Sequence, residues 1–279
     1  MIAQHYKDML EAKSVIRQIS EWSTARGAEI GYENVFDYSL GNPSVPAPQK
    51  FTDVCLDLLE HVDPVTLHGY TPTLTLPDVR AKVAESLNRR FGMDYTSDHI
   101  FMTTGAAGAL AHAVRCIAVP GQNIVTFAPF FPEYKPYVEG AGLTLRVAPP
   151  RCEDFQVNFD VLDSLVDENT AAVLINSPNN PSGTAYSAET LTKLAAYLKK
   201  KSAEYGHHIF LISDEPYREI AFGGKTIPYP AKFYDDTMTC YSFSKSLSLP
   251  GERIGYLAVN PKAEQALTIA EVCPQVSRT

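Results

Sequence analysis

Seven short apolar segments, separated by stretches of helical or turn character, constrain what this chain can fold into more than any other feature. They lie at residues 100–104, 123–127, 144–149, 171–176, 208–213, 238–242 and 255–259. Apolar strands that alternate with helices are typical of a mostly parallel sheet covered by helices on both faces. The sequence therefore predicts an α/β fold of about seven strands, in which ligands bind at the carboxyl ends of the strands.

Helical patterns fill the segments before and between these strands. The expected helices span residues 6–26, 49–61, 77–91, 105–117 and about 188–203, with another after Pro132. The first is amphipathic, and we expect it to pack on the body of the protein or on a partner subunit. It is followed by the segment FDYSLGNPSVPAP, which predicts a short strand, a turn and an extended arm.

Composition argues against several classes of function. The 279 residues carry a net charge of -8, which disfavours nucleic acid or an anionic membrane as the main partner. No stretch approaches the ~20 apolar residues of a membrane span. The five cysteines are scattered and form no CxxC pair, which is typical of free thiols in a reducing compartment and indicates no zinc site. Because the N-terminus also lacks a signal-peptide core, we expect a cytoplasmic protein without a metal.

A cluster of hydroxyls and cations follows the strand at 238–242. Ser242 and Ser244 lie beside Lys245 in an expected loop, and Arg253 follows a Pro-Gly turn. Hydroxyls, an arginine and free backbone N–H groups at a strand end suit a phosphate dianion. A lysine beside that phosphate can form a Schiff base with an aldehyde on the same ligand, which indicates pyridoxal 5′-phosphate (PLP). The alternative is a serine-rich turn with two solvated cations.

An acidic residue, Asp214, stands at the end of the strongly apolar strand at 208–213. A carboxylate in such a place is unfavourable unless it is paired. A protonated pyridine nitrogen would pair with it and draw electrons into the ring. Tyr217 is close enough in sequence to reach an oxygen on the same ring. The alternatives are a helix cap for Asp214 and simple packing for Tyr217.

Three other strand ends carry residues that suit such a ligand. After the first strand, Ala106 and Ala107 open a helix whose N-terminus suits phosphate, or else they pack closely on the sheet. After the second, an aromatic cluster with Phe131 and Tyr134 offers a face for a heteroaromatic ring, or else fills the core. After the fourth, Asn180 lies in a proline-held turn and can donate to a phenolate oxygen, or else serves only the turn.

Taken together, these motifs resemble one family. Asn180-Pro181-x-Gly183, Asp214-x-x-Tyr217 and Ser242-x-Ser244-Lys245 with Arg253 are similar, in order and in spacing, to the motifs of the class I/II aminotransferases. These are PLP enzymes of fold type I, the fold of aspartate aminotransferase. The resemblance covers the chain from about residue 37 onward.

The resemblance implies a role for each matched residue. Lys245 would form the Schiff base and move a proton between the substrate Cα and the cofactor. Asp214 would hold the proton of the pyridine nitrogen, and Tyr217 and Asn180 would donate to the ring oxygen. Phe131 would stack on the ring. The phosphate would be held by the backbone N–H groups of Ala106 and Ala107 and by Ser242, Ser244 and Arg253.

Two further positions concern the partner and the substrate. Tyr70 resembles the tyrosine that reaches the phosphate of the neighbouring subunit, which implies a homodimer. Gly41 resembles the glycine whose backbone meets the substrate carboxylate, and we expect Asn180 to contact the substrate as well. Thr75 departs from the pattern, because the family usually has a glycine there.

The C-terminus also departs from the pattern. The family continues into a small domain that carries the arginine for the substrate α-carboxylate, whereas this chain stops at Thr279 in what resembles the linking helix. No residue here matches that arginine. The expected organisation is an N-terminal helix and arm at 1–45 and a PLP-binding large domain at 46–279, with the small domain absent.

The resemblance implies PLP-dependent transfer of an amino group between an amino acid and a 2-oxo acid, and it leaves the substrates open. One alternative is a carbon–sulfur β-lyase or a related elimination enzyme of the same fold. Another is a PLP-sensing regulatory domain, which needs an attached DNA-binding domain. The residues before the first motif are too few and not basic enough for such a domain, so this alternative ranks below the enzyme.

Overall fold

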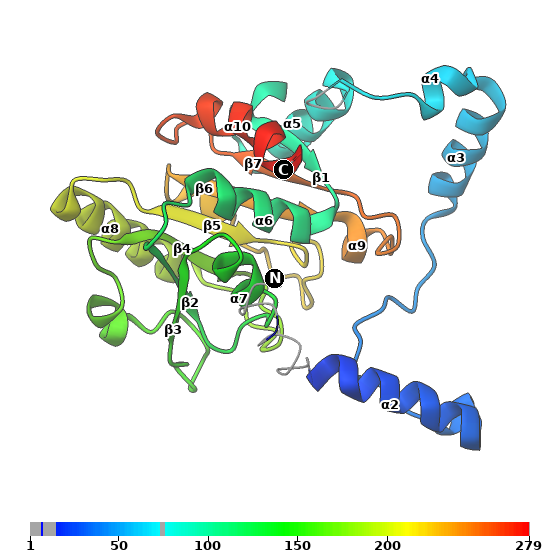
Figure 1. The fold of residues 1–279 in the computed structure, drawn as a ribbon, viewed down its shortest axis with the longest axis horizontal. Helices are drawn as coiled ribbons and strands as arrows, with labels where there is room; N and C mark the ends of the chain where they lie inside the picture. Colours follow the sequence, from blue (N-terminus) through cyan, green and yellow to red (C-terminus); the bar gives the residue numbers. More distant parts are fainter. Residues whose placement is uncertain (1–6, 8–14, 73–75, 279) are drawn as a thin grey trace. The chain divides into compact units, whose positions relative to one another are not determined.

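The computed structural model describes residues 7, 15–72 and 76–278, and the chain divides into two compact units, residues 1–44 and 45–279. In the first unit, helix α2 spans Val15–Ile30 and the 3-10 helix η1 spans Tyr32–Asn34 (Figure 1). The helix predicted at 6–26 therefore runs four residues further, because Gly31, with φ of 89°, is the residue that leaves the helical region. Residues 6 and 8–14 of the predicted helix lie outside the described residues.

The second unit is built on one seven-stranded sheet, which contains all seven strands predicted from residue 100 onward (Figure 1). The short strand predicted in FDYSL is wrong, because those residues form no strand. The strands are β1 (Ile100–Thr103), β2 (Asn123–Phe127), β3 (Thr144–Ala148), β4 (Thr170–Asn176), β5 (Phe210–Asp214), β6 (Thr237–Ser242) and β7 (Gly255–Val259). Their order is β1-β7-β6-β5-β4-β2-β3. Strand β7 runs antiparallel to both of its neighbours, and all other pairs are parallel. The predicted α/β fold with a mostly parallel sheet is confirmed.

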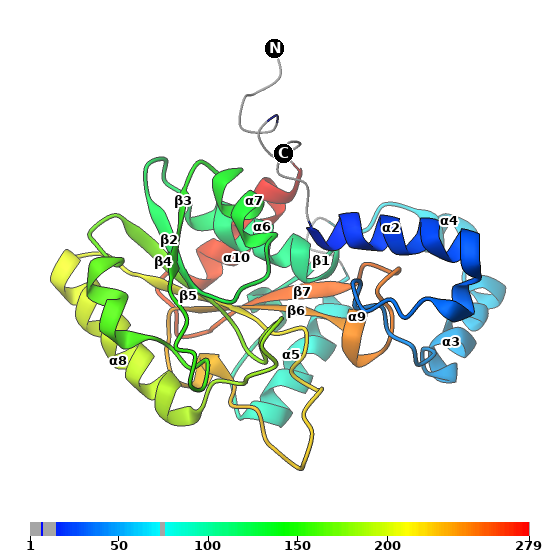
Figure 2. The ribbon, with the colours of Figure 1, turned by 90° about the horizontal axis from the view of Figure 1, so that it is seen from below.

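Helices of this unit cover both faces of the sheet. The helices of the unit as a whole are α3 (Gln49–His61), α4 (Pro64–His68), α5 (Pro77–Phe91), α6 (Gly105–Ile117), α7 (Tyr134–Glu139), α8 (Ala188–Tyr205), α9 (Phe243–Ser246) and α10 (Ala266–Arg278), with short 3-10 helices η2 (Ser97–His99), η3 (Phe159–Ser164) and η4 (Pro230–Lys232). Figure 2 shows α6, α7 and α10 on one face and α5 and α8 on the other. No described helix combines the length and the apolar composition needed to cross a bilayer.

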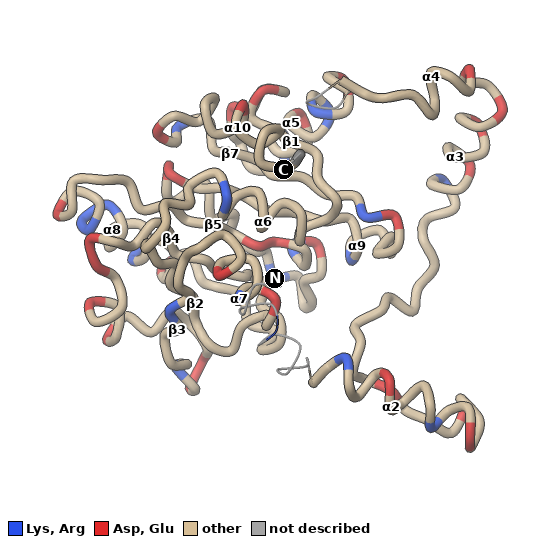
Figure 3. The backbone as a smooth tube through the Cα atoms, in the orientation of Figure 1, with Lys and Arg blue, Asp and Glu red and all other residues tan. Residues whose placement is uncertain are grey.

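Charged residues of both signs are interspersed along the helices, as Figure 3 shows for α2 and α8. In α8 the Lys201 ammonium lies 3.1 Å from the Asp163 carboxylate and 3.2 Å from that of Glu204. These two ion pairs place opposite charges beside Lys201, which is itself buried.

Helix α8 ends later than predicted, and helix α4 was not predicted, each for a local reason. Helix α8 runs two residues past the predicted end, to Tyr205, because Gly206 adopts the left-handed conformation that ends it. Helix α4 was not expected, and it forms because the Asp63 carboxylate accepts a 2.9 Å hydrogen bond from the Thr66 N–H, with Pro64 in the first turn.

The core lies in layers on the two faces of the sheet. Every residue of β4 is buried, as expected for a central parallel strand covered on both sides. Its alternate residues face different layers, so Leu174 packs with α6 and α10 whereas Val173 packs with α8. In the strand register Asn176 lies opposite Asp214, and Asp214 lies opposite Cys240. The carboxyl ends of β4, β5 and β6 therefore lie side by side, which brings the predicted motifs to one edge.

Candidate active site

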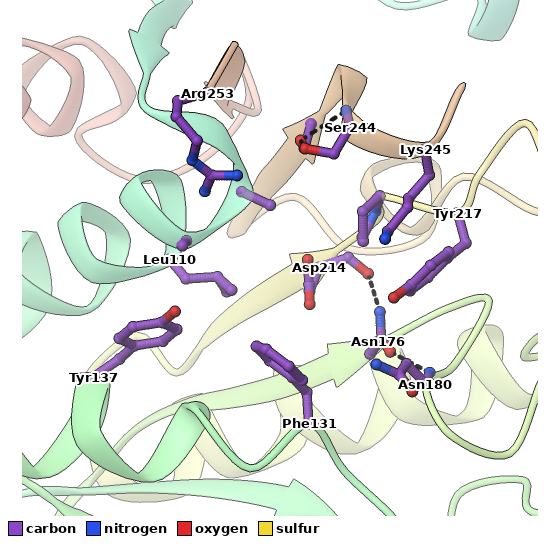
Figure 4. Close-up of a pocket in the computed structure, with 14 residues that line it drawn as sticks. Leu110, Phe131, Tyr137, Asn176, Asn180, Asp214, Tyr217, Ser244, Lys245 and Arg253 are labelled. Carbon is purple, nitrogen blue, oxygen red and sulfur yellow. Dashed lines mark hydrogen bonds between the residues drawn. The ribbon is translucent and has the colours of Figure 1, made fainter. Parts of the chain in front are cut away.

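A cavity of about 300 Å³ opens at this edge of the sheet (Figure 4). Its lining comes from the first turns of α6, from the loop after β2 and from α7, from the ends of β4, β5 and β6, from α9 and from the loops that follow β4, β5 and α9. The lining residues are Ala106, Ala107, Leu110, Phe131, Tyr137, Asn176, Asn180, Asp214, Pro216, Tyr217, Ser242, Ser244, Lys245 and Arg253. The structure thus brings together all the predicted site residues except Tyr70 and Gly41.

The acid at the centre of the cavity is Asp214, whose carboxylate points into it in Figure 4. Only 4% of the residue is exposed, and the Tyr134 hydroxyl donates a 2.6 Å hydrogen bond to its Oδ2. Burial raises the pKa of Asp214 to about 7; the Glu215 carboxylate also raises it, while the Tyr134 hydrogen bond lowers it. The other oxygen, Oδ1, has no hydrogen-bond partner among the described residues. A buried acceptor of this kind fits a protonated ring nitrogen of the cofactor.

An amide side chain that the sequence motifs did not single out, Asn176, fixes two of these residues. Its Nδ2 donates to the Asp214 backbone carbonyl at 2.9 Å, and its Oδ1 accepts from the Asn180 N–H at 2.6 Å. One buried side chain therefore joins the end of β5 to the turn that carries Asn180. The sequence carried one feature that could have identified Asn176. It is an asparagine at the end of an otherwise apolar strand, where a buried polar side chain needs hydrogen-bond partners.

Lys245 does not lie in the predicted loop but in the one-turn helix α9. The helix forms because Ser242 caps it, with its Oγ accepting a 3.0 Å hydrogen bond from the Ser244 N–H. The hydroxyls of Ser242 and Ser244 are also 2.6 Å apart. Figure 4 shows the Lys245 side chain directed toward the space between Asp214 and Tyr217. Burial lowers the pKa of Lys245, which favours its neutral amine.

A cationic and backbone-rich wall forms the opposite side of the cavity. Arg253 donates from Nη1 to the Pro250 carbonyl at 2.9 Å and from Nη2 to the Thr104 carbonyl at 3.4 Å. A Cβ on Gly105, where φ is 77°, would lie 3.0 Å from Arg253 Nη2, so only glycine allows this close approach. Helix α6 begins at Gly105. Its N-terminal N–H groups and the positive end of its dipole therefore add to the attraction that the Arg253 guanidinium has for an anion. This wall fits a phosphate group.

The remaining lining residues are aromatic or amide groups around the centre. Phe131 lies edge-on to Tyr134, with ring centroids 5.8 Å apart, and it lines the cavity (Figure 4). Burial raises the pKa of Tyr217 and the Asp214 charge raises it further, so the phenol keeps its proton as a donor. Asn180 lies beside it. These three side chains suit a flat ring that carries a hydroxyl.

Two predicted residues lie elsewhere. Tyr70 is fully exposed and is not among the lining residues of the cavity. Gly41 belongs to the first unit of the chain. Thr75 lies outside the described residues. The roles of Tyr70 and Gly41 therefore stay predictions.

Comparison with known proteins places the chain in a family. Residues 33–274 match the model of the family "Aminotransferase class I and II". A crystal structure of an amino transferase from Eubacterium rectale is 43% identical with a TM-score of 0.95, over 100% of this chain and 70% of that one. The aspartate aminotransferase of Thermotoga maritima is 29% identical over 239 residues, which is 85% of this chain and 61% of that protein.

A protein with another named activity also matches. A cystine lyase from Arabidopsis thaliana is 31% identical over 229 residues, which is 79% of this chain and 52% of that protein. The chain thus spans between half and two thirds of the length of these two curated relatives. With its sheet order, its cavity and the match over residues 33–274, the chain belongs to the class I and II aminotransferases, a family of PLP-dependent enzymes.

Proposed function

We propose that the protein containing this chain binds PLP at the cavity and transfers an amino group between an amino acid and a 2-oxo acid. The observation that carries this proposal is that the Asp214 carboxylate, with its unpartnered Oδ1, and the Lys245 amine line the same small cavity. They would meet opposite ends of one pyridine ring. The bound cofactor would supply an aldehyde for the Schiff base and a ring that takes up the electrons of the substrate Cα–H bond.

The base in this reaction is Lys245. Burial lowers its pKa, so a larger fraction of the amine is neutral near pH 7 than for an exposed lysine. The neutral amine would take the proton from the substrate Cα and deliver it to the cofactor carbon that carried the aldehyde. The Tyr217 hydroxyl and the Asn180 amide would both donate hydrogen bonds to the ring oxygen. These two bonds would fix the orientation of the ring relative to the Lys245 amine that moves the proton.

The acid, Asp214, would hold a proton at the ring nitrogen. A carboxylic acid with a pKa of about 7 is partly protonated at neutral pH, and a positive ring nitrogen beside it favours its ionised form. Arg253, the two serine hydroxyls and the N-terminus of α6 would hold the phosphate, while Phe131 would cover one face of the ring. These contacts orient the ring and exclude water from it.

The substrate would be an amino acid whose carboxylate reaches Gly41 and Asn180, as the family resemblance implies. We also propose a homodimer in which Tyr70 reaches the neighbouring cavity. This assembly is supported by the complete exposure of Tyr70. A cytoplasmic location is part of the proposal and is supported by five cysteines without a disulfide.

A second candidate function is the elimination of a sulfur-containing group from an amino acid. The match to a protein named cystine lyase favours it. Both reactions begin with the same proton transfer by Lys245, so the cavity supports either. Release of pyruvate and ammonia without any 2-oxo acid would favour elimination over amino transfer. Binding of PLP without turnover of any amino acid would instead support a regulatory domain.

The test begins with cofactor binding and then examines turnover. PLP is titrated into the wild-type chain and into Lys245→Ala, and the absorbance of the lysine-bound cofactor is followed. We expect that band only in the wild type, and equal spectra would overturn the assignment of Lys245. A panel of amino acids is then offered to the full-length protein with 2-oxoglutarate or pyruvate. Formation of the matching 2-oxo acid from at least one donor supports amino transfer.

A further inference from the structure

Two cysteines far apart in the sequence meet between α6 and α10. Cys116 lies in the last turn of α6 and Cys273 lies in α10, with their Sγ atoms 3.6 Å apart. Cys273 Sγ donates to the Ile269 carbonyl at 3.2 Å, and Cys116 Sγ lies 4.0 Å from the same oxygen. Both thiols therefore gather at one point of the interface between the two helices.

The separation is close to what a disulfide needs. The S–S bond is about 2.05 Å long, so the sulfurs at 3.6 Å would have to approach by roughly 1.5 Å. Rotation of the two side chains about their Cα–Cβ bonds moves each sulfur by more than that amount. The remaining cysteines are Cys55 in α3, Cys152 in a loop and Cys240 in β6, and none of them bonds to another sulfur in the part of the chain that the structure describes.

The two thiols differ in their access to an oxidant. Cys116 is half-buried, whereas Cys273 is completely buried. The adjacent Cys116 sulfur and burial both raise the pKa of Cys273, so Cys273 is the less reactive of the two thiols toward an oxidant in solvent. A reagent from solvent therefore meets Cys116 first, and Cys273 is placed to resolve the product.

We propose that Cys116 and Cys273 form an oxidative modification site that takes a hydroperoxide and closes a disulfide between α6 and α10. The Cys116 sulfur attacks one peroxide oxygen, the O–O bond breaks, and the first water leaves with the thiol proton. Cys273 sulfur then attacks the sulfenic sulfur of Cys116. The S–S bond forms, the S–O bond breaks, and the second water carries away the Cys273 proton. Two thiols lose two electrons, and one hydrogen peroxide is reduced to two waters.

The consequence for the structure follows from where the two helices lie. The first turn of α6 lines the cavity, and Arg115, near its other end, donates to the Val276 carbonyl of α10 at 3.1 Å. Pro274 lies inside α10 and has no N–H to donate to the helix. A bond at Cys273 would fasten this turn of α10 to α6 and would join residues 157 positions apart. We therefore expect the oxidised chain to unfold at a higher temperature than the reduced chain. The backbone amides of α10 should also exchange their hydrogens more slowly after oxidation.

The experiment treats the reduced 279-residue chain with equimolar hydrogen peroxide and no reductant. We expect the titre of free thiols in denaturant to fall by two from five, the intact mass to fall by two hydrogen atoms, and a peptide map to join the Cys116 and Cys273 peptides. Dithiothreitol should reverse all three changes. Cys116→Ser and Cys273→Ser should each lose the cross-link, while Cys152→Ser, which changes an exposed cysteine, should keep it.

Several outcomes would overturn the proposal. They are a wild-type map in which Cys116 carries only a sulfinic acid, a disulfide through Cys55 or Cys152, and a thiol titre that does not change. The map is made on the wild type, so it decides the question even if Cys273→Ser fails to fold. Because no step involves PLP, this result is independent of the proposed catalytic function.

Discussion

The hydroxyl of Tyr134 donates a 2.6 Å hydrogen bond to Oδ2 of Asp214, and the two residues are 0% and 4% exposed. Burial, the Asp214 charge and this hydrogen bond raise the pKa of Tyr134, so it remains a donor at any pH near neutral. The bond favours the ionised form of Asp214. It also holds the carboxylate with its other oxygen available to the cavity.

Replacement of Tyr134 by Phe is expected to weaken PLP binding by about tenfold to a hundredfold, because a hydrogen bond to a charged group contributes about 1.5–3 kcal/mol. Loss of the donor removes the influence that lowers the pKa of Asp214, so this pKa should rise further. The dissociation constant is measured by PLP titration between pH 6 and 8. The control is Tyr186→Phe, since Tyr186 is also buried and its hydroxyl does not bond to Asp214. Equal losses in both variants would contradict the assigned role.

The cofactor-free chain should be destabilised by Asp214 at neutral and higher pH. Its pKa is raised from 3.8 to about 7 in the folded chain, so folding favours the protonated acid. This contribution to stability is fully present below pH 4 and is lost as the pH rises to about 7, with a total change of a few kcal/mol. Urea unfolding is compared for wild type and Asp214→Asn from pH 5 to pH 8. The variant should become the more stable of the two as the pH rises, and a constant difference would contradict the prediction.

The sequence predicted the sheet well because its strands are buried and apolar along their whole length. Strand β4 is buried at every position, and a short continuous apolar run bounded by turns is typical of a fully buried strand. The prediction that the motifs with Lys245, Asp214 and Asn180 lie together at strand ends was also correct. It succeeded because the carboxyl ends of parallel strands meet at one edge of the sheet.

Contacts between distant residues could not be predicted in the same way. Tyr134 and Asp214 are 80 positions apart, and no local pattern links the first residue of α7 to that acid. The helix at Lys245 is only one turn long and depends on the cap from the Ser242 side chain. The same kind of side-chain hydrogen bond also stabilises a simple turn, so the sequence does not distinguish a turn from a short helix here. The antiparallel direction of β7 depends on how the chain returns after Arg253 and not on the composition of the strand.

The contribution of Arg253 to phosphate binding can be separated from its structural role. Arg253→Met is expected to weaken binding of PLP by roughly tenfold to a hundredfold, because a charge-assisted hydrogen bond contributes about 1.5–3 kcal/mol. Pyridoxal, which lacks the phosphate, should bind the variant and the wild type with equal affinity. Arg151→Met is the matched control, because Arg151 pairs with Asp154 at an exposed loop away from the cavity lining. If both ligands lose affinity equally, Arg253 supports the fold and not the phosphate.

The close approach of β7 to the start of α6 should require a glycine at position 255. A Cβ there would lie 2.7 Å from the Gly105 carbonyl carbon, which is backbone and cannot move aside cheaply. Gly255→Ala is therefore expected to destabilise the chain by about 1–3 kcal/mol, as overpacking in a core does. It should also weaken PLP binding, because Gly105 begins the helix that lines the cavity with Ala106.

The matched variant for this test is Gly251→Ala, where an added Cβ meets no atom within 4 Å and φ is not in the left-handed region. Its effect on the free energy of unfolding should stay within about 0.5 kcal/mol, as for most surface changes. Both variants are unfolded in urea and titrated with PLP. Loss of stability in Gly255→Ala with unchanged PLP affinity would show that the first turn of α6 does not hold the phosphate. Unchanged stability in Gly255→Ala would contradict the close packing of β7 on α6.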